Sequence, residues 1–389
     1  NIIYLYPSVF LSGVVDPQDY ITDKISSKDV ILQLKNKIAQ YLISEEVQKY
    51  AKGNGDIKTW YWAAPLLLDK TIAESGIIDE WLNKGIPQTE TVTDSEEEIP
   101  QREESSGKSK YFTRIKDIFN KPDDLDLPPL GESHVMNVAE YLATLALASP
   151  SICYLRTQLR YSEMLTTQLL DNSFDVASAF VSYFNKPESI SIIRLCTKHL
   201  EKVSYLDRVL EYSLAGNIQA MLDEYFYLVR ELEGLYGMDE ISTHLSDILS
   251  IRSTTTKIDD LNSFLKSTVS DTEVRSTAIR THFAMDFAGQ KLSTSKTSGR
   301  QINIRQAFNS PFRPFVLATT SIGQEGLDFH LYCRKIFHWN LPANAIDIEQ
   351  REGRINRYKG LVIRQNLVEK YSRCLSSDKN LNKWDELFI

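Results

Sequence analysis

Apolar residues recur every three or four positions through the middle of the chain, which is the spacing of one face of an α-helix. The clearest stretches are 30–51, 139–148, 162–174, 190–214 and 218–236. Gly216, Gly234 and Gly237 lie at or near the ends of two such stretches, where a helix commonly ends. The pattern predicts a mainly helical region over 131–275.

The first 130 residues have a more mixed pattern. Residues 1–13 are rich in aliphatic and aromatic side chains and predict a strand, whereas the aromatic stretch 57–68 predicts part of the core. Residues 91–110 are acidic and polar, with almost no apolar side chain to offset the entropy of ordering them. We therefore expect a mixed α/β region over 1–130 with a solvated, disordered insertion at 91–110.

After residue 272, short apolar runs alternate with helical patterns. Strands are predicted at 278–287, 315–319 and 335–339, and helices at 302–308 and 346–355. Strands that alternate with helices at this pitch are typical of a parallel sheet. The predicted fold class is α/β, with a parallel-sheet lobe over 276–370, the mainly α-helical region before it, and a C-terminal tail over 371–389.

Composition narrows the function classes only a little. The chain has 389 residues, of which 42% are hydrophobic and 25% charged, so it can bury a sizeable core. With 44 basic and 52 acidic residues its net charge is −8, which excludes a generally basic nucleic-acid coat protein. Binding to a nucleic-acid backbone needs only a local basic surface, so nucleic acid stays open as a partner.

Cysteine usage and hydropathy bear on metals and location. The four cysteines form no CxxC pair, so we expect no metal site and no disulfide framework, and a cytoplasmic location fits. The longest apolar run, 141–155, is interrupted by polar residues and is too short to span a bilayer, so we expect no membrane partner. The chain begins with Asn1 rather than Met, which hints at a fragment.

Two short stretches have parts of an ATPase site without completing it. Residues 107–109 read Gly-Lys-Ser, like the end of a phosphate-binding loop, but Arg102 stands where the first glycine would be. Asp223 and Glu224 look like a magnesium-binding acidic pair, yet the apolar stripe around them has helical spacing. We expect both carboxylates to lie on an exposed helix face.

A run of hydroxyl residues and glycines follows the predicted strand 315–319. Residues 318–328 include Thr320, Ser321 and Gly323. Small residues at the carboxyl end of a strand let backbone amides approach a phosphate closely, and an open α/β sheet binds ligands there. A generic strand-to-helix turn could use the same residues.

A second candidate site lies further along, within 349–357. Arg354 and Arg357 are three positions apart, so on a helix they would lie on one face. Two guanidiniums aimed at one place suit a phosphate, because arginine offers planar, bidentate, permanently charged donors. In phosphoryl transfer such a finger neutralises charge that develops on the transferred group. Taken alone, the two arginines would also fit a solvated helix face.

In this order, the two segments resemble motifs V and VI of the superfamily-two helicases. Residues 318–328 stand in the place of motif V, and 350–357 match the motif VI pattern Gln-x-x-Gly-Arg-x-x-Arg. Residues 337–342 and 357–360 look most like the Swi/Snf-type double-stranded DNA translocases and their bacterial relatives. The resemblance covers 276–370 and implies a RecA-like lobe with a parallel sheet.

For the second motif, the resemblance implies a role in ATP hydrolysis. Arg354 and Arg357 would reach the γ-phosphate of ATP across a cleft between two lobes, and Gln350 would couple ATP to the lobe interface. These three are the expected catalytic residues. Gly353 is expected in the cofactor-binding set.

For the first motif, the resemblance implies contacts with both ligands. Asp328 would lie near the ribose of the nucleotide, and Gly326 joins it in the cofactor-binding set. Thr320, Ser321 and Gly323 would contact the nucleic-acid backbone, which we expect to be double-stranded DNA rather than RNA.

The sequence departs from a complete motor in one respect. It contains no lysine-bearing phosphate loop and no credible Asp-Glu-x-His box. The expected function is therefore the C-terminal part of an ATP-dependent helicase or double-stranded DNA translocase, inactive alone, with ATP and Mg²⁺ held mainly by a separate N-terminal ATPase lobe.

Two other function classes stay open. The first is a non-catalytic scaffold or adaptor that retains a helicase-lobe fold, although the intact Arg354 and Arg357 argue against it. The second is a nucleotide-independent nuclease or repair module, for which the sequence offers no cluster of metal ligands.

Overall fold

The structure of the chain is a computed structural model. It describes residues 2–20, 25–73, 75–85, 99–250, 254–259, 276–281, 305–312, 316–317, 330–376 and 382–388. The chain forms two compact units, the first made of Asn1–Ser246 with Asn366–Ile389 and the second of Asp247–Gln365.

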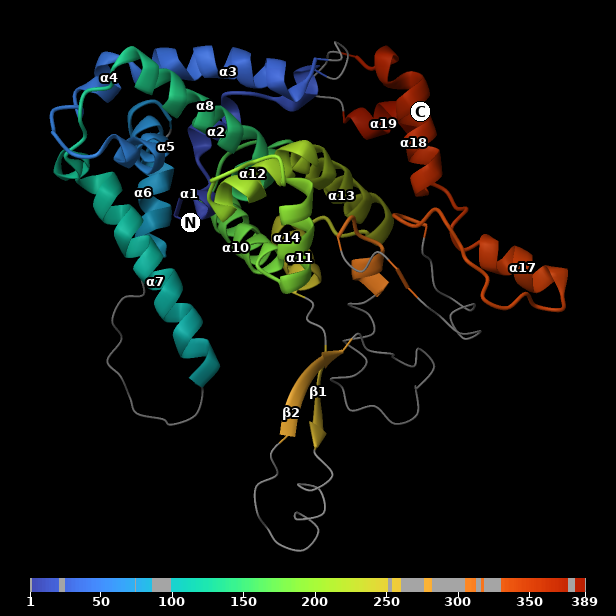
Figure 1. Cartoon of the computed structure of the whole chain (residues 1–389). Coiled ribbons are helices and arrows are strands. Elements are labelled where there is room, and N and C mark those ends of the chain that lie inside the picture. The colour runs from blue at the N-terminus through green and yellow to red at the C-terminus, as the bar shows by residue number, and fades with distance from the viewer. Residues whose placement is uncertain are drawn as a thin grey trace, which may run out of the picture. The chain divides into compact units, whose positions relative to one another are not determined.

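The first unit is built from α-helices (Figure 1). In chain order they are α1 (Ile2–Leu5), α2 (Val9–Gly13), α3 (Ser27–Leu42), α4 (Glu45–Gln48), α5 (Trp60–Thr71), α6 (Ser75–Lys84), α7 (Ile99–Asn120), α8 (Glu132–Ala148), α9 (Pro150–Leu159), α10 (Thr167–Phe184), α11 (Pro187–Cys196), α12 (Tyr205–Ala215), α13 (Ile218–Glu233), α14 (Met238–Ser250) and α19 (Lys383–Phe388). Short 3₁₀ helices are η1 (Pro17–Tyr20), η2 (Ile57–Thr59), η3 (Pro122–Leu125) and η5 (Ser372–Cys374). The helices predicted from apolar periodicity within 131–250 are present, but 190–214 forms two helices, α11 and α12, instead of one.

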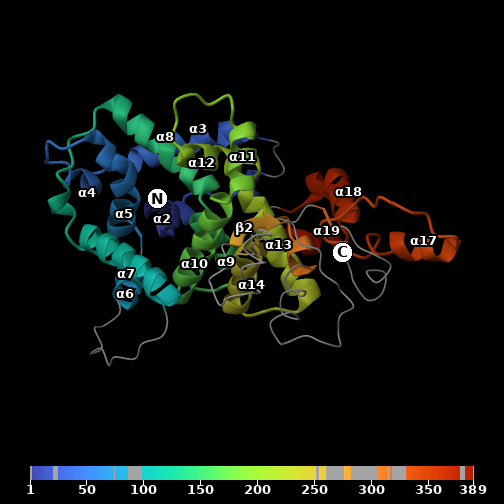
Figure 2. The same cartoon turned by 60° about the horizontal axis from the view of Figure 1, so that its bottom comes forward.

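Helices α8 and α9 provide much of the centre of this unit. Helix α3 runs along α8, as Figures 1 and 2 both show, and α9 packs against α10 and α13. A second apolar cluster joins α6, α7 and α10, where Trp81 and Phe112 meet edge to face with ring centroids 4.9 Å apart. Among the described residues no single helix is long and apolar enough to cross a membrane. Helices α8 and α9 taken together have the length and composition of a membrane span, but they are bent by 57° relative to each other.

Helix ends in the first unit follow local capping chemistry. Ser204 and Asp207 form a capping box at the start of α12, each side chain accepting from the other's backbone N–H. Gly234 ends α13 in the left-handed region, at φ 68°, which glycine adopts without a steric penalty. Gly216 ends α12, so both glycines stand where the sequence placed helix ends.

Residues 2–5 and 9–13 are helical, so the strand predicted over 1–13 is wrong. Ser8 caps α2, and the buried carboxylate of Asp69 on α5 accepts hydrogen bonds from the backbone N–H groups of Val9 (3.2 Å) and Phe10 (2.6 Å). These donors are the groups that a helix start leaves unsatisfied. Burial raises the pKa of Asp69 to about 7, although its hydrogen bonds act in the opposite direction.

Asp223 is buried, so its predicted exposure on a helix face is wrong. Its carboxylate accepts hydrogen bonds from Thr157 of α9 (2.6 Å) and from Gln219 one turn earlier (2.9 Å). Arg160 lies 3.3 Å from it and forms a bidentate pair with Asp16, with both N···O distances 2.7 Å. Polar side chains from α9 and its C-terminal end therefore cover the face of α13 that carries Asp223, outside the apolar stripe.

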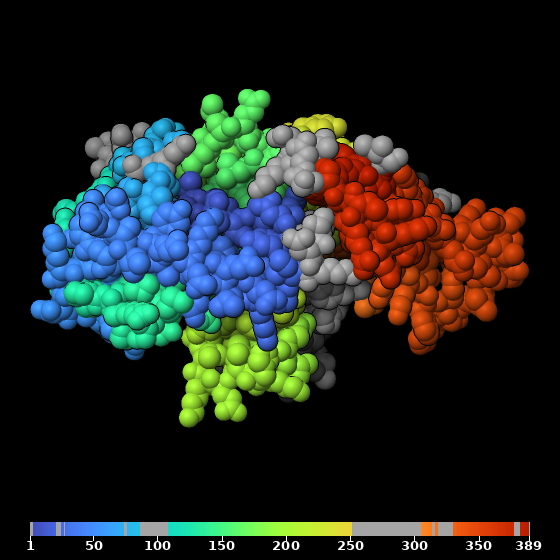
Figure 3. Space-filling view, turned by 90° about the horizontal axis from the view of Figure 1, so that it is seen from above, coloured from blue at the N-terminus to red at the C-terminus, as the bar shows by residue number. Residues whose placement is uncertain are grey.

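The loop that leads into η2 is closed against the segment after η3. Gly53 donates to the Leu127 carbonyl oxygen (2.8 Å), and a Cβ at this glycine would lie 2.3 Å from backbone and side-chain atoms of Asp126. Figure 3 shows the corresponding blue and teal surfaces meeting. Only glycine fits this approach, so the two distant segments form one face.

Part of the acidic insertion has regular structure. Within 91–110, residues 99–110 form the first turns of α7, and the rest lies outside the described residues. Lys108 pairs with Asp175 of α10 at 2.9 Å, and its ammonium lies 5.0 Å from the ring centroid of Phe174. These contacts with α10 join the end of the insertion to the helical unit.

The described part of the second unit corrects the predicted fold class. Strands β1 (Thr254–Asp259) and β2 (Ser276–Thr281) pair antiparallel, with Thr254 opposite Thr281. The helices are α17 (Ala345–Glu352) and α18 (Leu361–Tyr371), which runs on into the first unit, and 305–308 are helical as predicted. The RecA-like parallel sheet expected over 276–370 is therefore wrong for the described structure.

The run 335–339 is irregular instead of forming a strand. Its aromatic side chains are open to solvent, with Phe337 94% and Trp339 91% exposed. An apolar run forms a buried strand only when neighbouring strands satisfy its backbone and cover its side chains. No such strand is paired with it among the described residues. The run 315–319 lies outside the described residues apart from 316–317, which are irregular.

Candidate phosphate-contacting segment

Helix α17 and the turn after it hold the described part of the candidate site. Asn344 caps the helix, because its side-chain oxygen accepts from the Ile346 N–H at 3.0 Å. Gly353 ends it, and its N–H donates to the Glu349 carbonyl oxygen at 2.9 Å. The predicted helix over 346–355 is therefore present but ends at Glu352.

The two arginines lie after this helix, not on it. The N–H of Arg354 donates to the Arg351 carbonyl oxygen (3.2 Å), so Arg354 stands in a tight turn directly after α17. Arg357 follows in an irregular stretch and is exposed, whereas Arg354 is half-buried and Gln350, in the last turn of α17, is exposed. The shared helical face expected for the arginines is wrong. A turn, rather than a helix, sets their spacing.

A second turn, over 357–360, directs the chain away from Arg357. The Gly360 N–H donates to the Arg357 carbonyl oxygen at 2.9 Å, and Lys359 adopts the left-handed region at φ 56°. A Cβ at Gly360 would lie 2.9 Å from the same carbonyl oxygen. The Leu361 N–H then donates to the His330 carbonyl oxygen, also at 2.9 Å. These bonds hold the end of the segment against 330–332.

Arg364 holds the backbone of this turn through hydrogen bonds. It was not among the site residues expected from the sequence. It is 1% exposed and donates to the carbonyl oxygens of Lys359 (2.6 Å) and Leu331 (2.7 Å). Its guanidinium also lies 5.1 Å from the ring centroid of Tyr332. Nothing in the one-letter pattern separates Arg364 from the exposed arginines, because its partners are backbone carbonyls that only folding brings near.

The other side of α17 is tied to the irregular run before it. Arg351 donates to the Asn340 carbonyl oxygen at 3.2 Å, and the Nε2 atom of His338 lies 3.8 Å from a carboxylate oxygen of Glu352. These contacts hold 338–340 beside the helix that carries Gln350. The segment is thus supported at both ends by hydrogen bonds to backbone.

The structure brings together only the second of the two motifs. Gln350, Gly353, Arg354 and Arg357 lie within one helix end and its turn. The other expected site residues fall outside the described residues; these are Thr320, Ser321, Gly323, Gly326 and Asp328. No group of three or more His, Cys, Asp or Glu side chains within the described ranges could hold a metal ion.

This arrangement suits binding of an anion in solution. Arg354, which is half-buried, and Arg357, which is exposed, follow the end of α17 three positions apart. Hydrogen bonds from Arg364 and from the Gly360 N–H hold the backbone of this segment. Guanidinium donors bind phosphate oxygens in a planar, bidentate way. The residues present therefore fit a nucleotide phosphate, and they offer no carboxylate cluster for its metal among those the structure describes.

Comparison with known families relates this segment to helicases. Residues 255–359 match the family described as helicase conserved C-terminal domain, and the match includes Gln350, Gly353, Arg354 and Arg357. This supports a C-terminal helicase lobe of the superfamily-two type. The chain matches no curated protein and no solved structure.

Proposed function

We propose that the second unit is the C-terminal motor part of an ATP-dependent nucleic-acid helicase or translocase. Arg354 and Arg357 act there as arginine fingers on the γ-phosphate, and Gln350 links the bound nucleotide to the interface between lobes. The observation that carries the proposal is the family match, since it ends at residue 359 and so includes the whole Gln-x-x-Gly-Arg-x-x-Arg segment.

The geometry supports a phosphate ligand at this segment. Both guanidiniums are at least partly open to solvent, whereas Arg364 beneath them is buried and engaged with backbone carbonyls. A guanidinium on a turn whose backbone is held by hydrogen bonds needs little rearrangement when negative charge develops on a nearby phosphate. Arg364 thus positions the turn that carries Arg354 and Arg357.

ATP and Mg²⁺ are the cofactors of this proposal. When bound, they supply the phosphoryl group and the charge that polarises it, and a separate ATPase lobe holds most of their contacts. Gly353 and, in the first motif, Gly326 and Asp328 face the nucleotide. This chain's own task is to orient its guanidiniums toward the phosphate and to help exclude water.

The nucleic-acid partner in this proposal is double-stranded DNA. The resemblance of 337–342 and 357–360 to the Swi/Snf-type translocases favours DNA over RNA. Thr320, Ser321 and Gly323 contact its backbone, and the site of action is the cytoplasm.

A non-catalytic adaptor is the second candidate function. The exposed Phe337 and Trp339 favour it, because solvent-exposed aromatic side chains often bind another protein. The two proposals differ in what the arginines do, since an adaptor needs neither guanidinium.

The experiment that tests the proposal is ATP turnover with and without the ATPase lobe. The isolated chain should hydrolyse ATP at background rate, and the complete motor should show turnover that DNA stimulates. Robust turnover by the isolated chain would contradict the division of labour between lobes. A complete motor that DNA does not stimulate would favour the adaptor.

A further inference from the structure

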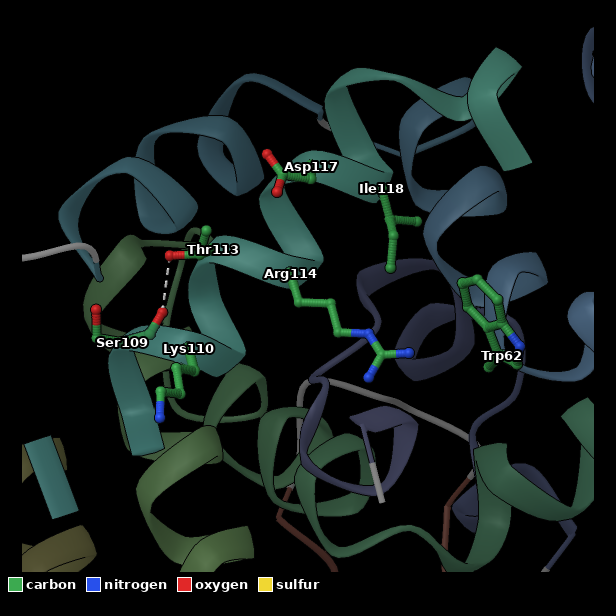
Figure 4. Close-up of a pocket in the computed structure, with 7 residues that line it drawn as sticks. All are labelled: Trp62, Ser109, Lys110, Thr113, Arg114, Asp117 and Ile118. Atoms are coloured by element: carbon green, nitrogen blue, oxygen red, sulfur yellow. Dashed lines mark hydrogen bonds between the residues drawn. The ribbon is translucent and has the colours of Figure 1, made fainter. Parts of the chain in front are cut away.

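A groove lies on the first unit between α7 and the side chain of Trp62 on α5 (Figure 4). Its volume is about 400 Å³. It is lined by Trp62, Ser109, Lys110, Thr113, Arg114, Asp117 and Ile118. The groove is remote in sequence from 255–359 and belongs to the first unit alone.

Two cations on α7 line this groove, and neither is paired with a carboxylate among the residues that the structure describes. Lys110 and Arg114 stand one helical turn apart and both are exposed. Neither side chain forms a hydrogen bond or ion pair with any residue that the structure describes. Like charges at this spacing destabilise a helix, so α7 bears an electrostatic cost that a bound anion would relieve.

Asp117, the carboxylate among the described residues that line the groove, forms no ion pair with either cation. Asp117 is three positions after Arg114, yet the two side chains form no ion pair. In Figure 4 the Asp117 carboxylate points away from the Arg114 guanidinium, which extends toward Trp62. The space between Arg114 and Trp62 therefore faces a cation on one side and an indole ring on the other.

The remaining polar side chains of the groove are hydroxyls. Ser109 and Thr113 stand one turn apart beside the two cations, and the Thr113 hydroxyl donates to the Ser109 carbonyl oxygen at 3.0 Å. Lysine, arginine, serine and threonine are among the side chains that contact phosphates in nucleic-acid complexes. Trp62 packs against the apolar core of the unit, so its ring forms a fixed wall.

We propose that this groove binds the phosphodiester backbone of a nucleic-acid strand. Lys110 and Arg114 contact phosphates one helical turn apart, and Trp62 packs against the sugar or base between them. The choice of nucleic acid as the anion rests on the proposed function. The net charge of −8 makes such a local basic surface necessary for any nucleic-acid contact.

The test compares two double variants with equal loss of charge. K110Q/R114Q removes both cations from the groove, and R194Q/K198Q removes one arginine and one lysine from exposed positions in and just after α11. Affinity for a labelled single strand and for a duplex of the same length is measured on the full chain at fixed low salt. Thermal unfolding of all variants shows that they fold.

The expected result is a loss specific to the groove. K110Q/R114Q should weaken oligonucleotide binding roughly tenfold. It should also reduce the magnitude of the slope of log binding constant against log salt concentration by about 2, as expected for two lost phosphate contacts. The affinity of R194Q/K198Q should stay within about twofold of wild type. The single-strand and duplex arms show which form the groove takes. Trp62→Leu should weaken the single strand more than the duplex if the base stacks on the ring.

Three results would overturn the inference. Equal weakening by both double variants would show general charge attraction, and no weakening by K110Q/R114Q would show that the groove is not used. A wild-type chain that binds neither oligonucleotide would also exclude it. If R354A/R357A lowers ATP turnover in the complete motor while K110Q/R114Q leaves oligonucleotide binding intact, only the groove assignment fails and the proposed function stands.

Discussion

The guanidinium of Arg364 donates a hydrogen bond to the Lys359 carbonyl oxygen, 2.6 Å away. Lys359 is in the left-handed region and lies within the turn that begins at Arg357. A buried arginine on α18 therefore holds the backbone that carries the proposed finger. Rigid support of this kind is what a catalytic side chain needs to act without reorganisation.

Arg364→Met should destabilise the second unit. The change leaves the Lys359 and Leu331 carbonyl oxygens without their charged donor, and each lost bond of this kind costs roughly 1.5–3 kcal/mol. Urea unfolding followed by hydrogen exchange of the second unit measures the loss. Arg334→Met, an exposed site in the same unit, serves as the control and should change stability by less than about 0.5 kcal/mol. Equal stability of the two variants would show that Arg364 is not a support.

Asp69→Asn should flatten the pH dependence of stability in the acid range. Burial raises the pKa of Asp69 to about 7 from 3.8, so between these pH values the folded chain keeps a proton that the unfolded chain has lost. The free energy of unfolding therefore falls as pH rises through this window and levels off above it.

Chemical unfolding at several pH values between 4 and 7, read as the difference between variant and wild type, measures this effect of Asp69. Asp117→Asn, at an exposed carboxylate, should keep the wild-type slope. If Asp69→Asn keeps it too, the carboxyl group does not titrate as proposed.

Asp16→Asn should act in the opposite direction. Burial alone would raise the pKa of Asp16, but its hydrogen bonds and ion pair with Arg160 outweigh it and hold the pKa below 3.8. Stability from this pair is present above the unfolded pKa and is lost as pH falls through the folded one. The pair is only part-buried, so the variant should lose roughly 1.5–3 kcal/mol near neutral pH, the range for hydrogen bonds to a charged group, and much less in strong acid.

A double-mutant cycle with Arg160→Met isolates the coupling between Asp16 and Arg160. A large positive coupling energy at pH 7 that shrinks in acid is expected. Additive losses would mean that the two side chains contribute independently.

The sequence predicted the helices of the first unit because burial there follows local periodicity. Helix α13 has its apolar stripe as expected, but the burial of Asp223 depends on Thr157 and Arg160, which come from α9. In the same way, α2 replaces a β-prone segment because Asp69, about sixty residues later, satisfies its first N–H groups. Partners distant in sequence leave no trace in local spacing.

In the second unit, the family match covers the motif that the sequence singled out, whereas the predicted fold is wrong. The Gln-x-x-Gly-Arg-x-x-Arg pattern lies within the family match, and α17 starts close to its predicted position. The sequence did not predict the turn that begins at Gly353. A helix over 346–355 and a shorter helix followed by a turn have the same pattern of apolar residues, so the pattern cannot distinguish them. The parallel sheet was inferred from alternating runs, and the described strands pair antiparallel instead.

The central claim is that Arg354 and Arg357 act on charge that develops at the γ-phosphate. Steady-state ATP turnover of the complete motor at saturating DNA tests it, beside DNA affinity at fixed salt. Arg354→Ala and Arg357→Ala should each cut kcat by roughly 10³–10⁵ with little change in DNA affinity, and lysine should rescue poorly because it lacks the planar fork. Arg373→Ala, at an exposed arginine outside the segment, should leave both quantities unchanged. Near-normal turnover in both arginine variants would contradict the account and leave the adaptor in its place.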